Sequence, residues 1–99
     1  MTDSKQNEAT NASIISNLSA KYEIAQVLDT SGTRCPIPLL RAKKELKMLN
    51  MGGFLLVIAT DPSAKGDFDA MLKHLPHSLV DYQSVIEPSR VDYFVIQKG

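Results

Sequence analysis

The chain has 99 residues, and its 11 basic side chains balance 11 acidic ones, so the formal net charge is zero. A chain of this length forms one domain with a modest core. Zero net charge argues against sequence-independent binding to a phosphate backbone, because that affinity comes from neutralised phosphates. One cysteine and two histidines exclude a disulfide scaffold and offer no convincing zinc site, so we expect no metal.

Residues 1–20 are rich in Asn, Ser, Thr and Ala. Such a composition buries too little apolar surface to offset the entropy lost on ordering, so we predict a flexible N-terminal extension. Ile14, Ile15 and Leu18 are the exception, because a short helix could present them to a partner or to the domain's own sheet. The sequence shows neither a secretory signal nor an apolar run of membrane-spanning length, so we expect a cytoplasmic protein without membrane contact.

The remaining residues, 21–99, predict four strands and two helices. Alternating apolar side chains from Tyr22 to Leu28 indicate the first strand. The elements expected after it are a helix over about 35–50, a strand over 54–59, a helix over about 61–75, and strands over 79–86 and 91–97. The order β-α-β-α-β-β predicts an α/β two-layer sandwich with a mixed four-stranded sheet and both helices on one face.

The strand expected over 54–59 is apolar on both faces, although a two-layer fold covers only one. Its far face is therefore either partly exposed or covered by an oligomer or by the N-terminal segment. We expect a monomer.

The only cysteine, Cys35, precedes Pro36 and Pro38 at the expected start of the first helix. Prolines suit a first helical turn, so we predict Cys35 as the helix N-cap, with the prolines positioning the sulfur. The positive end of the helix and the neighbouring Arg34 would favour the thiolate, so we predict a lowered thiol pKa. A lone thiol closes no disulfide within its chain, so its reaction partner is a sulfur on another molecule.

Acidic residues are expected near this loop. Asp29 ends the first strand, three residues before Gly32, and could hold the loop by accepting backbone N–H groups. Asp61 is predicted to cap the second helix. The two histidines, His74 and His77, lie at the far end of that helix, so a Cys–His pair is not expected, and the sequence suggests no general base.

The outer side of the first predicted helix combines apolar and basic residues. Its apolar members and one lysine recur at spacings of three and four: Ile37, Leu40, Lys44 and Met48. The basic residues around them are Arg34, Arg41, Lys43, Lys44 and Lys47. Such a run is either a solvated face or, because apolar groups lie among the cations, a surface for partner docking.

Residues 22–98 resemble the TusA-like (SirA-like) sulfur carriers. The resemblance rests on these residues, in the family's order: Leu28-Asp29, Gly32, Cys35-Pro36-Ile37-Pro38, Leu46, Gly52, Val57, Asp61-Pro62 and Asp67. It implies a fold like the C-terminal domain of bacterial initiation factor 3. It also implies that residues 21–99 form a sulfur-carrier domain, in which Asp61 and Asp67 contribute to docking or orientation.

The resemblance further implies a sulfurtransferase-type carrier that acts only with partner proteins. Cys35 would accept a sulfane sulfur as a persulfide from a donor such as a cysteine desulfurase, and pass it to an acceptor protein without a cofactor. Ile37 replaces an acidic residue common in tRNA-thiolating members, and Thr33 replaces a larger apolar one. The pathway therefore stays open among tRNA 2-thiouridine synthesis, molybdenum-cofactor supply, sulfur oxidation and selenium handling.

Two other functions are alternatives. One is a partner-binding or regulatory module in which Cys35 only caps a helix. The other is an RNA-binding domain, which the zero net charge and the six aromatic residues disfavour, so no direct nucleic-acid binding is expected.

Overall fold

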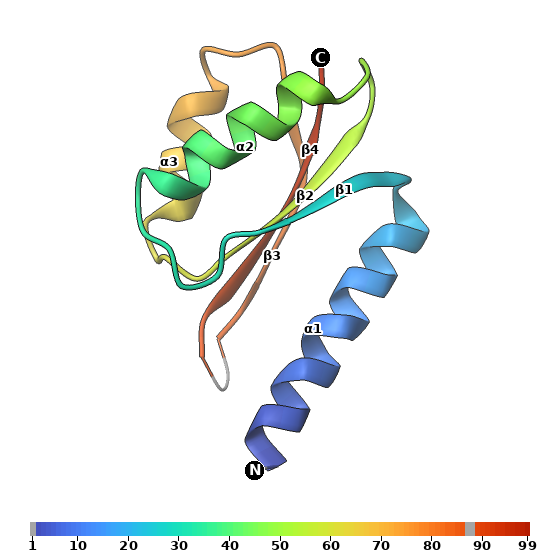
Figure 1. Cartoon of the computed structure of the whole chain (residues 1–99), viewed down its shortest axis with the longest axis vertical. Coiled ribbons are helices and arrows are strands. Elements are labelled where there is room, and N and C mark those ends of the chain that lie inside the picture. Colours follow the sequence, from blue (N-terminus) through green and yellow to red (C-terminus); the bar gives the residue numbers. More distant parts are fainter. Residues whose placement is uncertain (1, 87–88) are drawn as a thin grey trace.

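A mixed four-stranded sheet carries helices on both of its faces (Figure 1). The structure is a computed structural model that describes residues 2–86 and 89–99, with side chains described from residue 12 onward. The described elements are α1 (Thr2–Lys21), β1 (Ile24–Asp29), α2 (Ile37–Met48), β2 (Phe54–Ala59), α3 (Ala64–Leu72), β3 (Ser78–Val85) and β4 (Val91–Gln97). The α/β class, the mixed sheet and the two helices on one face are confirmed, and α1 is an additional helix.

The strand order is β1-β2-β4-β3. Strands β1 and β2 run parallel, whereas β4 is antiparallel to both β2 and β3. The central strands β2 and β4 are buried along most of their length, and β1 is largely exposed as an edge strand. Because β1 and β2 are parallel, the loops that follow them emerge at the same edge of the sheet.

The main core lies between the sheet and helices α2 and α3. Leu46 of α2 and Phe68 of α3 are fully buried against this face. The ring centroids of Phe68 and Phe94 are 4.7 Å apart. The apolar stripe of each helix thus meets one face of the buried strands, as the helical spacing predicts.

The other face of the sheet carries a second core. Leu18 is 2% exposed and packs with the side chains of β2 and β4 that face away from the main core: Leu56, Ile58, Tyr93 and Val95. Ile14 and Ile15 pack beside it. This packing departs from the predicted flexible extension over residues 1–20, in the part whose side chains the structure describes. The alternative is confirmed: this apolar trio meets the domain's own sheet, because the apolar far face of β2 supplies the surface that the helix needs.

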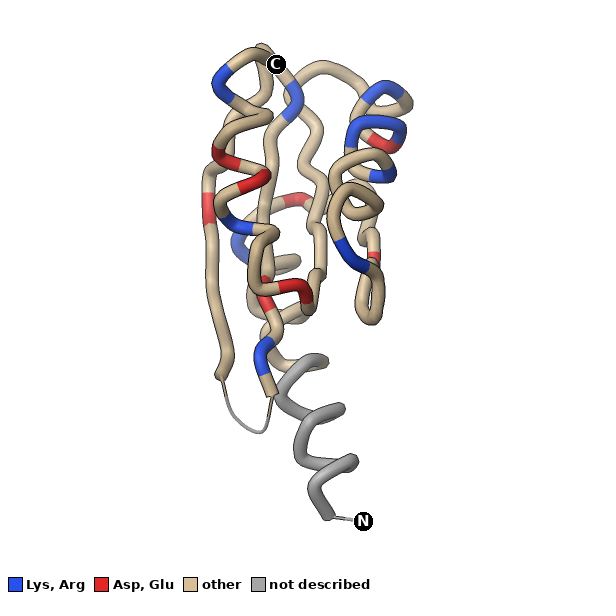
Figure 2. Tube along the Cα trace, turned by 90° about the vertical axis from the view of Figure 1, so that its left-hand side faces the viewer, with Lys and Arg blue, Asp and Glu red and all other residues tan. Residues whose placement is uncertain are grey.

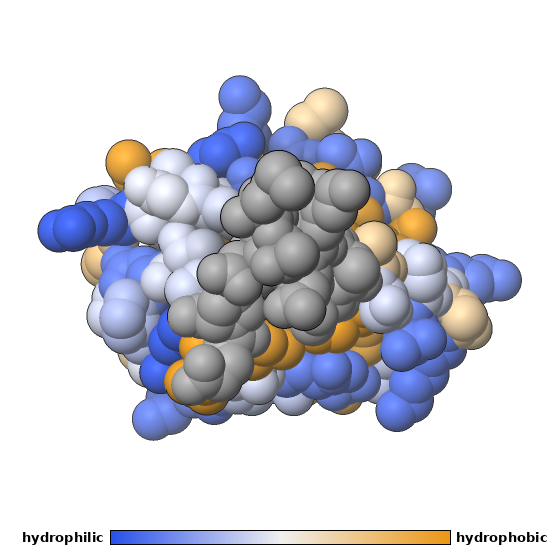
Figure 3. All heavy atoms as spheres, turned by 90° about the horizontal axis from the view of Figure 1, so that it is seen from below, coloured by the Kyte–Doolittle hydropathy of each residue, from blue (hydrophilic) through white to orange (hydrophobic). Residues whose placement is uncertain are grey.

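Side chains at the end of α1 tie it to β3. The hydroxyl of Tyr22 donates to Asp81 at 3.1 Å, and Lys21 lies 3.8 Å from the same carboxylate. Figure 3 shows the molecule from the end at which α1 begins. Most of the described surface on this side is hydrophilic, and apolar residues gather in a few small patches. Among the described residues, none of the helices combines the length and the apolarity needed to cross a membrane.

Candidate functional site

Cys35 lies in the loop between β1 and α2, at the sheet edge where the loop between β2 and α3 also emerges (Figure 1). Its side chain is exposed, and the peptide bond between Cys35 and Pro36 is cis. Helix α2 begins at Ile37, with Pro36 at the N-cap position and Pro38 buried in the first turn. The prediction that Cys35 caps this helix is therefore wrong. A separate turn, in which Ile37 N–H donates to Arg34 C=O at 2.9 Å, precedes the helix and includes the cysteine.

Asp61 joins the two loops. Its Oδ2 atom accepts the backbone N–H of Cys35 at 2.7 Å, and its Oδ1 atom accepts Ser63 N–H at 3.0 Å and Ser63 Oγ–H at 2.9 Å. These hydrogen bonds, and the charge of Arg34, lower the pKa of Asp61. The prediction that Asp61 caps the second helix is corrected, because Ser63 occupies that position. Asp61 instead holds the loop between β1 and α2, residues 30–36, hereafter the cysteine loop.

The first half of the cysteine loop is anchored by three further side chains. Asp29 Oδ1 accepts Ser31 N–H at 2.9 Å, which confirms the predicted hydrogen bond from this carboxylate to the loop backbone. Thr60 Oγ1 accepts Gly32 N–H at 2.8 Å. Gly32 has a φ of +81°, a conformation that glycine adopts without a steric cost.

Buried Thr30 donates its hydroxyl to Ile58 C=O at 2.6 Å and thereby fixes the start of the loop to β2. Neither Thr30 nor Thr60 was among the site residues predicted from the sequence. The signal available was their position: each follows the last residue of a parallel strand.

Two carboxylates act on the exposed thiol of Cys35. Hydrogen bonding to the Asp67 side chain raises the pKa of Cys35, and the desolvation of the sulfur and the charges of Asp67 and Asp61 act in the same direction. The predicted lowering of the thiol pKa is therefore corrected. It rested on a cap position that Cys35 does not occupy, and it left out the carboxylates that the second loop and α3 bring to the sulfur.

A cleft of about 380 Å³ lies between the two loops. It is lined on one side by Gly32, Thr33 and Arg34, and on the other by Thr60, Asp61 and Pro62. Arg34, which lines this cleft, is the residue before Cys35 in the chain.

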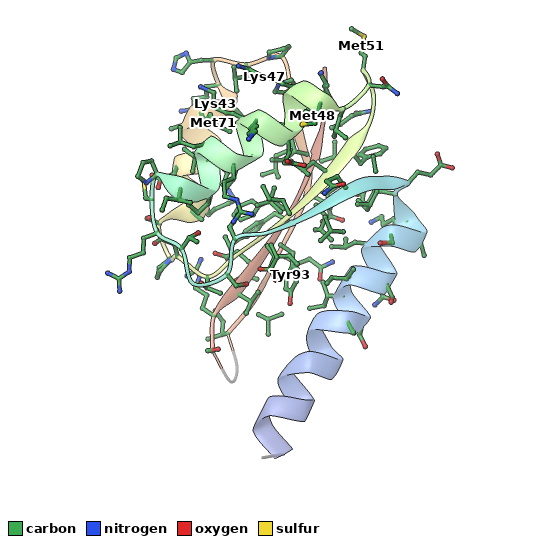
Figure 4. All side chains as sticks on the ribbon, in the orientation of Figure 1. Lys43, Lys47, Met48, Met51, Met71 and Tyr93 are labelled. Atoms are coloured by element: carbon green, nitrogen blue, oxygen red, sulfur yellow. The ribbon has the colours of Figure 1, made fainter. Side chains whose placement is uncertain are left out.

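Helix α2 presents the predicted apolar residues on its outer side. Ile37 is 46% exposed, Leu40 59% and Met48 75%. The basic side chains Arg41 and Lys44 are also exposed. Figure 2 shows basic residues gathered along this helix, and Figure 4 places Lys43, Lys47 and Met48 on it.

Met51 was not identified from the sequence. It lies just beyond α2, is 83% exposed, and extends the apolar part of this side (Figure 4). The structure thus brings Asp61 to the loop that contains Gly32 and Cys35, and places Arg41, Lys44 and Met48 progressively farther along α2. Among the described residues, His, Cys, Asp and Glu form no group placed to hold a metal ion.

The fold and the cysteine loop agree with one protein family. A family model described as Sulfurtransferase TusA matches residues 26–98, which include both loops, α2, α3 and all of β2, β3 and β4. The chain belongs to this family.

Individual relatives agree with this assignment. The sulfur carrier protein TusA of Allochromatium vinosum is 44% identical over 74 residues, covering 75% of this chain and 93% of that protein. A Neisseria meningitidis protein, provisionally named as a sulfur carrier, is 46% identical over 57 residues, covering 58% of this chain and 77% of that protein.

A solved structure is also similar. The crystal structure of a SirA-like protein from Desulfitobacterium hafniense has a TM-score of 0.60 at 25% identity, covering 75% of this chain and 97% of that one. Family membership gives this chain a role in sulfur transfer, in which it would work with sulfur donor and acceptor proteins.

Proposed function

We propose that the protein carries sulfur as a persulfide on Cys35. One observation carries the proposal: the only thiol of the chain is exposed at a sheet edge, in a loop whose backbone the Asp61 carboxylate holds at 2.7 Å. Exposure lets a sulfur on a second protein reach the thiol, and the anchored backbone holds the sulfur in a fixed place for that encounter.

The donor in this proposal is a protein persulfide, such as the one formed on a cysteine desulfurase. Cys35 attacks the outer sulfur of the donor; a bond from Cys35 Sγ to that sulfur forms, and the donor's sulfur–sulfur bond breaks. An acceptor thiol then removes the outer sulfur from Cys35 in the same way. The acceptor belongs to tRNA thiolation or to another sulfur-transfer pathway.

The outer side of α2 is the proposed docking surface. Ile37, Leu40 and Met48 supply exposed apolar contacts beside the cysteine loop, and Arg41 and Lys44 supply positive charge among them. Apolar contacts ringed by charge favour a partner that is apolar at its centre and acidic at its rim. Docking was also considered for Asp61 and Asp67. Asp61 accepts the backbone N–H of Cys35, and Asp67 lies 3.3 Å from the hydroxyl of Ser63.

Sulfur uptake tests the proposal. The protein is incubated with a cysteine desulfurase, its pyridoxal phosphate and cysteine, and the intact chain is weighed by mass spectrometry. We expect the chain to gain the mass of one sulfur atom, which a reductant removes. The Cys35→Ser variant should fold and gain nothing. A wild-type chain that takes up no sulfur, or a variant that still does, would contradict the proposal.

The alternative function was a regulatory module in which Cys35 only caps a helix. The structure does not support that role for Cys35, since Pro36 occupies the cap position. If Cys35→Ser retains the whole function of the protein, that class of module would nevertheless replace the carrier.

A further inference from the structure

Helix α1 lies against the face of the sheet opposite α2 and α3 (Figure 1) and contacts it through a narrow stripe. Leu18 is buried in this contact, Ile14 and Ile15 are half-buried beside it, and the other side chains described in the helix are exposed. At its end, Tyr22 Oη–H donates to Asp81 at 3.1 Å. The described part of α1 is therefore held by a short apolar stripe and by polar contacts to Asp81.

The sheet face beneath α1 is a continuous apolar surface. Leu56 and Ile58 of β2 lie opposite Val95 and Tyr93 of β4, and all four side chains are at most 2% exposed. Half-buried apolar side chains surround this block and extend it to the outer strands: Ile24, Phe54, Val85 and Val91. Four strands of about six residues span roughly 20 Å by 20 Å, on the order of 400 Å². Soluble monomers rarely expose an apolar patch of that size.

Helix α1 can be separated from the rest of the fold. The main core, between the sheet and helices α2 and α3, takes its packed side chains from residues 28–96. Only residues 22 and 23 connect α1 to β1, and the part of the chain that matches the family model begins at residue 26, after the helix. Release of α1 would therefore leave the main core and the family's shared elements in place.

We infer that α1 masks a self-association surface: the sheet face beneath it would otherwise bind the same face of a second copy of the chain, and α1 keeps the protein monomeric. The inference is independent of the sulfur-carrier proposal. A second copy fits because a two-fold axis places identical patches on each other, and the four central side chains of this patch are uncharged. Two sheets joined in this way would pack face to face about 10 Å apart.

The nearest described ion pair of α1 agrees with such a contact. Lys21 lies 3.8 Å from Asp81, and Asp81 belongs to β3, which is an edge strand of the sheet. The carboxylate would thus lie at the rim of the contact between two copies, where a charged group can keep its water. The apolar block on β2 and β4 would form the centre.

The test releases α1 in the full-length chain. Leu18→Asp places a charge in the apolar contact, so α1 should detach, because a buried unpaired charge is unfavourable. We expect amides in residues 12–21 to exchange with deuterium faster while those of α2 keep their protection. In sedimentation equilibrium the average mass of this variant should rise with concentration toward twice the wild-type mass. Asn17→Asp adds the same charge at an exposed neighbour and should stay monomeric.

A second substitution locates the surface. Ile58→Lys, combined with Leu18→Asp, places like charges against each other at the centre of the proposed contact and should restore the monomer. Leu40 is 59% exposed on the outer side of α2 and provides the matched control. Leu40→Lys combined with Leu18→Asp should leave the dimer intact, because that residue lies on a different apolar surface.

Three results would overturn the inference. The first is a folded variant with released α1 that stays monomeric. The second is a dimer that Leu40→Lys abolishes and Ile58→Lys does not. The third is a chain that unfolds in circular dichroism both with Leu18→Asp and with the milder Leu18→Ser, because α1 would then be an essential part of the core. None of these results depends on sulfur uptake by Cys35, so the carrier function is tested separately.

Discussion

Asp61 and Cys35 are 26 positions apart in the chain, yet the carboxylate of Asp61 accepts the backbone N–H of Cys35 at 2.7 Å. This hydrogen bond connects the loop after β1 to the loop after β2, and it involves the backbone of the cysteine, so it leaves the sulfur accessible. The most direct predictions concern this contact.

Replacing Asp61 by alanine should free the cysteine loop. Without the carboxylate, Cys35 N–H loses its acceptor, and we expect this amide to exchange with deuterium faster than in the wild type. Exchange followed by NMR or mass spectrometry measures the effect. Asp69→Ala removes an exposed carboxylate that does not contact the loop and should leave the exchange of this amide unchanged. Equal exchange in wild type and Asp61→Ala would show that the loop is held by other contacts.

The same carboxylate makes a pH-dependent contribution to stability. Hydrogen bonds from Ser63 and Cys35 lower the pKa of Asp61 in the folded chain below its unfolded value. Its contribution is therefore fully present above the unfolded pKa of about 4, and it is lost as the pH falls through the folded pKa.

Urea unfolding at a series of pH values checks this sign. The wild type should be more stable than Asp61→Ala at neutral pH, and the difference should shrink in acid. A difference that is constant or grows as the pH falls would contradict the assignment.

Leu18 should be important for stability despite its place in a polar segment. Its side chain is 2% exposed among Leu56, Ile58 and other residues of the second core. Leu18→Ala should therefore lower the free energy of unfolding by about 2 kcal/mol or more. The exposed neighbour Asn17 provides the control, and Asn17→Ala should change it by less than about 0.5 kcal/mol. Similar small effects of both substitutions in denaturant titrations would mean that α1 adds little to the fold.

A charge reversal on α2 should weaken docking. Lys44→Glu removes a positive charge from the proposed docking surface, so association with the sulfur donor should become slower and less sensitive to salt. Lys73→Glu changes the net charge equally at the end of α3 and should have a much smaller effect. Association rates measured at several salt concentrations decide the matter. Identical rates for the two variants would indicate that the outer side of α2 is an ordinary solvated face with no role in docking.

The sheet and its helices could be predicted from the sequence because their signals are local. The apolar run over 54–59 and the helical spacing that ends at Leu46 and Leu49 determine which faces are buried. The packing of α1 could not be judged from its average composition. Three apolar residues suffice there because β2 offers an apolar far face, and that match is visible only when both segments are placed together.

The surroundings of the thiol were predicted incorrectly for a related reason. Helix α2 begins at Ile37, so the sulfur of Cys35 is not at the cap position. Prolines on both sides of Ile37, Pro36 and Pro38, make that boundary difficult to locate from the sequence. The approach of Asp67 depends on how α3 sits beside the cysteine loop, a long-range relationship that no local pattern carries. Asp29, by contrast, acts within two residues of its own position, and its hydrogen bond was predicted correctly.

The anchoring of the cysteine loop also bears on how sulfur would travel between partners. Asp61 attaches Cys35 to the segment before α3. Thr60 and Thr30 attach the residues before Cys35 to the end of β2. The sulfur therefore sits on the body of the protein and has no long swinging arm of the kind that lets a tethered group visit two active sites in one assembly. We expect the donor and the acceptor to compete for the same side of the molecule. The carrier would then have to dissociate fully from the donor and diffuse to the acceptor in every transfer cycle.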